Sequence, residues 1–254
     1  MIFGKFRAVT QSQTVAIMGI VGLILFAMIA VPFYKSCKQK ETVTKLKVIH
    51  SAMTQANKLY SLATSDAIGE YSVEDESTEE FAQRYFTPYM KGIKVCNTSQ
   101  DNCWNKLQYT DLLNNKYIDK IDYSIILSTK AVLGFYKDEN GIMSIITDIN
   151  GKSGENKLGK DVFVFTFYSN NKNANLCDKS VYEQKYISEG LHFGGYDECG
   201  IPFDTYTYTE LSSKDLKDGC DKNAPKSENG IGVGSACLAR IYAVNWTIDK
   251  KYPW

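Results

Sequence analysis

The sequence lacks a net charge, because 29 basic residues balance 29 acidic ones. Proteins that bind nucleic acid through its phosphates carry a basic excess, so the composition predicts no nucleic-acid partner. The sequence also lacks CxxC pairs, and its two histidines, His50 and His192, lie far apart. These absences exclude the ligand spacings of the common structural zinc sites.

Catalytic motifs are absent as well. The chain contains no G-x-S-x-G, no P-loop, no G-x-G-x-x-G opening a helix after a strand, and no H-E-x-x-H. His50 lies in a helical pattern, and His192, in Leu191-His-Phe-Gly-Gly, is typical of a turn or surface position. We therefore predict no enzyme, no catalytic residue and no organic cofactor.

Charge is missing from one long stretch near the N-terminus. No charged residue occurs between Ala8 and Tyr34, and Val15 to Val31 is almost wholly apolar. About 20 such residues cross the hydrocarbon core of a bilayer as a helix. A cleaved signal peptide is the alternative, although no small-x-small cleavage site follows. We expect a short basic leader over residues 1–13 and a transmembrane helix over 14–35, in contact with the lipid bilayer.

The helical pattern continues beyond this stretch. No Gly or Pro occurs between Glu41 and Ala63, and apolar residues recur there at spacings of three and four. This predicts an amphipathic continuation over residues 36–65 and one helix of about 50 residues, kinked at Pro32. The alternative is a free-standing coiled-coil stalk, but the pattern is too short for one. The apolar stripe comprises Val43, Leu46, Ile49, Met53, Ala56 and Tyr60.

The remainder, residues 66–254, is predicted to be an exported α+β head. Ser77 or Thr78 can cap a short helix that runs to about Tyr89. Aromatic and β-branched runs then predict an antiparallel meander of three or four strands, with a hairpin turn at Asn140-Gly141. The runs begin at Tyr123, Ala131, Gly141 and Asp161. The long helix is expected to pack on this sheet.

The seven cysteines divide into one beside the apolar helix, Cys37, and six in the head. An even number in a segment predicted to be exported indicates disulfides, although buried reduced thiols are the alternative. The short polar loop between Cys96 and Cys103 favours a local bridge. The segment between Cys220 and Cys237 has few large apolar residues and needs a restraint, which leaves Cys177 with Cys199. Cys37 is expected to be free.

These disulfides place the head outside the cytoplasm. Together with the apolar helix, they predict a single-pass protein of the inner membrane with its head in the periplasm or outside the cell, or a component of a cell-surface filament.

The loop from Asp148 to Asp161 is rich in oxygen ligands. Asp148, Asn150, Asn156 and Asp161 are weak calcium candidates. Three lysines in the same loop oppose a cation. The alternative is a connection between strands whose Asp and Asn side chains bind backbone amides.

The layout resembles that of the type IV pilins and of the prepilin-like proteins of type II secretion systems (pseudopilins). The resemblance rests on Pro32 and on runs spread over the chain: Gln39–Lys47, Phe81–Met90, Asp148–Phe163, Cys237–Trp246 and Tyr252–Trp254. It implies a pilin-like fold and association with copies of the chain or with other pilin-like subunits.

Two functions follow from this resemblance. The first is a structural subunit of a type IV pilus or pseudopilus-like filament, anchored by its N-terminal helix. The second is an exported binding module, tethered to the membrane or at a filament tip, like a minor pilin or adhesin. The family's processing glycine is missing, and Val15 stands where the family has a glutamate that aids subunit docking. This departure favours the second function, and the continuous helix favours the first.

Overall fold

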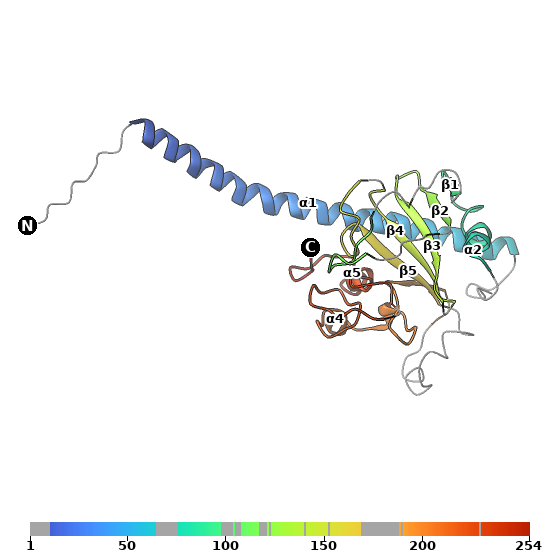
Figure 1. Cartoon of the computed structure of the whole chain (residues 1–254). Helices are drawn as coiled ribbons and strands as arrows, with labels where there is room; N and C mark the ends of the chain where they lie inside the picture. Colours follow the sequence, from blue (N-terminus) through green and yellow to red (C-terminus); the bar gives the residue numbers. More distant parts are fainter. Residues whose placement is uncertain are drawn as a thin grey trace, which may run out of the picture. The chain divides into compact units, whose positions relative to one another are not determined.

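The computed structural model describes residues 11–64, 76–97, 104, 108–116, 121, 123–139, 141–151, 153–168, 188, 190–228 and 230–254 (Figure 1). The chain divides into two compact units, Met1–Glu41 and Thr42–Trp254. Most of the leader expected at residues 1–13 lies outside the described residues. The loop expected at residues 66–77 also lies almost wholly outside them.

Helix α1 spans Gln11–Thr64 and contains Pro32. The expectation of one long helix is therefore correct. Its 54 residues continue from the apolar stretch into the amphipathic one. The absence of the helix breakers Gly and Pro between Glu41 and Ala63 allows this continuation. The unit boundary at Glu41 falls within this helix.

The predicted single-pass location in the inner membrane is contradicted. Among the residues that the structure describes, no helix contains a stretch long and apolar enough to cross a bilayer.

The second unit is built on one antiparallel sheet. Its six strands follow one another in the order β1-β2-β3-β4-β5-β6, so the sheet is a simple meander. Figure 1 shows β2 to β5 side by side across the unit. The strands are β1 (Lys94–Asn97), β2 (Tyr123–Ile126), β3 (Val132–Lys137), β4 (Met143–Asp148), β5 (Val162–Tyr168) and β6 (Gly190–Phe193). The four predicted strands are β2 to β5, and β1 and β6 extend the sheet on either side.

The stripe of α1 lies in the main core. Leu46, Ile49, Met53 and Ala56 are fully buried and cluster with one face of the sheet, including Phe135 of β3. The opposite face of the sheet carries a second cluster, which contains Val132, Ile146 and Val164. Every residue of β4 and β5 is therefore buried, because both faces of these strands are covered.

Helix α2 (Thr78–Tyr85) covers the same core as α1. Ser77 caps it, and its side chain accepts a hydrogen bond from the amide of Glu80 while the Glu80 carboxylate accepts one from the amide of Ser77. The sequence predicted a cap at Ser77 or Thr78, and the structure has it at Ser77 as a reciprocal capping box. The helix ends at Tyr85, earlier than the predicted end near Tyr89.

In the described residues after β6, the chain forms three short helices: η2 (Phe203–Thr205), α4 (Tyr208–Leu211) and α5 (Cys237–Ala243). Arg240 of α5 is fully buried and donates two hydrogen bonds to Asp249 and one to the carbonyl of Cys220. Its guanidinium also lies 5.6 Å from the ring centre of Tyr208 and 5.7 Å from that of Tyr252. One buried charge therefore joins α4, α5 and the C-terminal residues.

Candidate functional site

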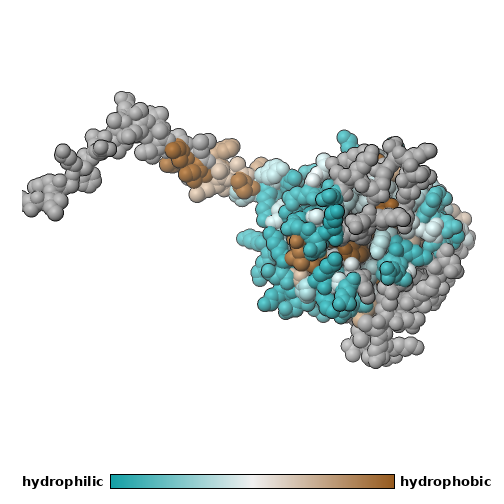
Figure 2. Space-filling view, viewed as in Figure 1, coloured by the Kyte–Doolittle hydropathy of each residue, from teal (hydrophilic) through white to brown (hydrophobic). Residues whose placement is uncertain are grey.

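The first unit exposes a large apolar surface on α1, drawn in brown in Figure 2. Soluble proteins rarely expose contiguous apolar areas of this kind unless they bind something. Phe26, Ile29 and Phe33 are each more than two-thirds exposed, at 71%, 72% and 71%. The surface, called here the apolar segment of α1, comprises Met18, Ile20, Val21, Ile24, Phe26, Met28, Ile29, Val31, Phe33 and Tyr34.

These side chains lie on all sides of the helix. At 3.6 residues per turn, Met18 and Ile29 point in nearly the same direction, whereas Ile20 and Val31 point to the opposite side. A helix that is apolar all round is normally buried all round. The apolar segment is therefore shaped for several neighbours and not for a single one.

The four calcium candidates fall in the connection between β4 and β5. Asp161 accepts hydrogen bonds from the backbone amides of Asn156 (3.0 Å) and Lys157 (2.7 Å). Asp148 accepts one from the amide of Asn150 (2.9 Å) and one from the Tyr109 hydroxyl (3.1 Å). Apart from the Tyr109 hydroxyl, these donors are backbone amides of the loop itself, as the alternative interpretation of the sequence expected.

The two other candidate ligands differ from each other. The side-chain oxygen of Asn150 accepts a hydrogen bond from the Lys45 ammonium group at 2.8 Å, which places a positive charge where calcium would bind. The side-chain oxygen of Asn156 is buried and has no hydrogen-bond partner among the described residues. Within the described ranges, no group of three or more His, Cys, Asp or Glu side chains is placed to hold a metal ion.

The backbone of the loop between β4 and β5 passes close to the carboxylate of Asp161. Gly154 has a φ of +131°, and a Cβ atom there would lie 2.2 Å from a carboxylate oxygen of Asp161. Only glycine allows this approach. Burial raises the pKa of Asp148 to about 7, and the neighbouring charge of Asp161 adds to the effect, although the amide of Asn150 and the Tyr109 hydroxyl oppose it. The loop between β4 and β5 is therefore a hydrogen-bonded connection that contains a buried titratable group, the carboxyl of Asp148.

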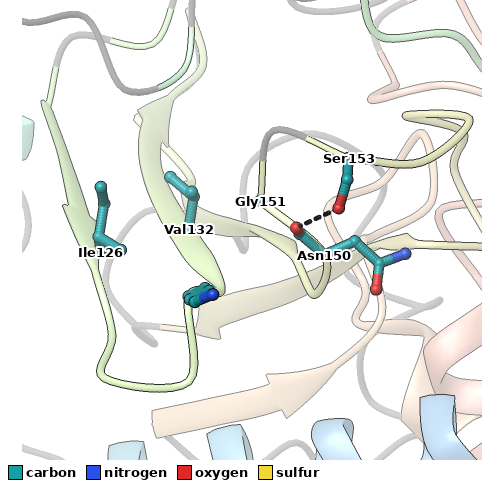
Figure 3. Close-up of a pocket in the computed structure, with 6 residues that line it drawn as sticks. Ile126, Val132, Asn150, Gly151 and Ser153 are labelled. Atoms are coloured by element: carbon teal, nitrogen blue, oxygen red, sulfur yellow. Dashed lines mark hydrogen bonds between the residues drawn. The ribbon is translucent and has the colours of Figure 1, made fainter.

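A pocket of about 350 Å³ lies beside this loop (Figure 3). Ile126 and Val132 form its apolar side, and Asn150, Gly151 and Ser153 form its loop side, where the Ser153 hydroxyl donates to the Asn150 carbonyl at 3.0 Å. Lys130 completes the lining. This volume lies at the lower end of the range for small-molecule sites.

The cysteines follow the expected division where they are described. Cys220 and Cys237, paired above from their spacing, are bonded, with their Cα atoms 4.7 Å apart. Cys96 and Cys199 also take part in disulfides, whereas their expected partners, Cys103 and Cys177, lie outside the described residues. Cys37 is free and exposed.

The two histidines differ in their surroundings. His50 is half-buried, with its ring 4.7 Å from that of Phe193, and burial lowers its pKa. His192 was expected in a turn or at the surface, and this expectation is wrong. It lies in β6 and is buried, with hydrogen-bond partners on both ring nitrogens. The run around it is too short and too rich in glycine to show a strand pattern, so sequence reasoning missed it.

Comparisons with protein-family models, with curated proteins and with solved structures found no significant match to this chain.

Proposed function

We propose that this protein is a structural subunit of a pilin-like or pseudopilin-like filament, in which copies associate through the apolar segment of α1. The role is one of assembly and not of catalysis. The observation that carries the proposal is the apolar segment itself, with ten large side chains exposed on all sides of one helix.

The distribution of these side chains favours a bundle over a pair. Each large apolar side chain contributes about 1.5–3 kcal/mol when it is removed from water. A single partner helix covers one stripe and leaves the opposite side, with Ile20 and Val31, in water. Three or more helices packed together cover all sides, as in the core of a filament. The resemblance to pilins, the antiparallel sheet and the disulfide support the same assignment.

Cys37 provides a direct test, because it is exposed and lies three residues beyond Tyr34 on α1. The full-length chain should sediment as assemblies larger than dimers, and a short bis-maleimide should crosslink Cys37 between copies. The double variant Phe26→Ser/Phe33→Ser should shift the sedimentation distribution towards the monomer by removing two of the most exposed aromatic side chains.

The matched control is Lys38→Ser, an exposed polar position on the same helix. It should leave assembly unchanged. A monomeric wild-type chain with no Cys37 crosslink would overturn the proposal, as would an equal effect of the control and the double variant.

A second function, a binding module at a filament tip, is favoured by the pocket beside Asn150. Such a module would bind its ligand as a monomer and would not need the apolar segment. If the Phe26→Ser/Phe33→Ser variant keeps the biological activity of the wild type while it no longer assembles, the binding module is the better assignment.

A further inference from the structure

His192 has an acceptor on each side of its ring. Nδ1 lies 2.8 Å from a carboxylate oxygen of Asp204 in η2, and Nε2 lies 2.7 Å from the backbone carbonyl oxygen of Ser188. The other carboxylate oxygen of Asp204 accepts a hydrogen bond from the amide of Phe193 at 2.8 Å. The side chains of His192 and Asp204 are 8% and 12% exposed, so water is largely excluded from this contact.

This arrangement determines how many protons the ring carries. A neutral imidazole has one N–H group and one lone pair. Neither the carboxylate of Asp204 nor the carbonyl of Ser188 can donate a hydrogen bond. A neutral ring would therefore direct a lone pair at one of two oxygen acceptors at hydrogen-bond distance, whichever tautomer it adopted. Both contacts are favourable only for the imidazolium, which donates from both nitrogens.

We propose that His192 and Asp204 form a pH-sensitive latch. With two protons on the ring, the latch holds β6 to η2 and fixes the chain at Ser188. Loss of the Nε2 proton to solvent leaves a lone pair facing the Ser188 carbonyl, so this contact opens while the Nδ1 hydrogen bond to Asp204 remains. Ser188 is then no longer held to His192, whereas the contact between β6 and η2 is kept.

The surroundings of the ring fit this role. The titratable groups that the structure places beside it are Asp204 of η2 and Tyr168 of β5, whose ring lies edge-on with its centre 6.0 Å away. Burial lowers the pKa of His192, but the hydrogen bond and charge of Asp204 and the Ser188 carbonyl outweigh it, so the pKa is raised. A raised pKa means that the latch is complete below about pH 6.5 and opens as the pH rises through the folded-state value.

Side-chain NMR titration of the full-length chain tests the latch. The protein has only two histidines, and the nitrogen shifts report the protonation of each. His192 should titrate above about 6.5 and His50 below it. The Nε2 shift of His192 should change through this titration, whereas the Nδ1 shift should stay that of a protonated nitrogen, because the hydrogen bond to Asp204 is kept.

One variant separates the latch from a merely structural contact. Asp204→Asn should lower the pKa of His192 so that protonation at neutral pH falls about tenfold or more, with His50 unchanged. A wild-type pKa of His192 at or below that of His50, or a pKa unaffected by Asp204→Asn, would overturn the proposal. The wild-type titration decides this even if a variant fails to fold.

Discussion

At the scale of single residues, three aspartates of the head share one hydrogen-bonding pattern. In each of them, one carboxylate oxygen accepts a hydrogen bond from a nearby backbone amide, and the other accepts one from a tyrosine hydroxyl. Each arrangement joins a turn to a more distant part of the chain, because the tyrosine belongs to another segment. The pairs are Asp138 with Tyr196, Asp148 with Tyr109, and Asp197 with Tyr206. These hydrogen bonds thus fix the polar loops to other parts of the head.

Asp148 gives the stability of the fold a pH dependence. In the unfolded chain it ionises near pH 3.9, whereas in the fold its pKa is about 7. The folded state therefore holds a proton that the unfolded state has lost, and the free energy of unfolding falls as the pH rises from about 4 to 7. Asp148→Asn should reduce this fall by on the order of 1–3 kcal/mol, as measured by urea unfolding at several pH values.

Some pH dependence should persist in this variant, since burial raises the pKa of Asp218 to about 6 and the latch at His192 acts in the same direction. Asp215→Asn, at an exposed position, is the control and should follow the wild type. Superimposable pH profiles of wild type and Asp148→Asn would mean that the Asp148 carboxyl is already ionised in the fold.

At the scale of elements, the stripe of α1 shares the main core of the second unit with one face of the sheet. Leu46→Ala and Met53→Ala should each lower the free energy of unfolding by about 2–5 kcal/mol, because both side chains are fully buried in the main core. Leu62→Ala is the matched control on the same helix, since Leu62 is 80% exposed. Equal effects at positions 46 and 62, measured by chemical unfolding, would show that the stripe does not pack as described.

The same elements show what a sequence can and cannot predict. The stripe from Val43 to Tyr60, the capping box at Ser77 and strands β2 to β5 were all predictable, because each has a local periodicity or a local hydrogen-bond pattern. Strand β6 was not, because its four residues, Gly190–Phe193, are held by pairing with β5 and not by their own propensity. His192 was misjudged for the same reason. Its two partners come from Ser188 and Asp204, and no pattern in the sequence links these positions.

The predicted single-pass location in the inner membrane was wrong, because no helix within the described residues is long and apolar enough to cross a bilayer.

At the scale of the whole molecule, the C-terminal region depends on cross-links more than on regular structure. The disulfide closes a loop with a sequence separation of 17 residues and joins Cys220 to α5, where Arg240 also holds the Cys220 carbonyl. The double variant Cys220→Ala/Cys237→Ala should lose ~3 kcal/mol of stability by the chain-entropy estimate. Thermal unfolding measures the loss, and Cys37→Ala is the control, because that thiol is free and exposed. A loss below about 1 kcal/mol would mean that Arg240 and burial alone hold the region.

The hydrogen bond from the Phe193 amide to Asp204 also changes what the edge of the sheet offers to other chains. β6 is the last strand of the sheet, and an exposed last strand offers its amides as a template for cross-β growth. Because the Phe193 amide already donates to Asp204, it is not available to an incoming strand, and the negative charge of Asp204 repels an incoming carbonyl oxygen. This contact therefore disfavours edge-to-edge pairing at β6.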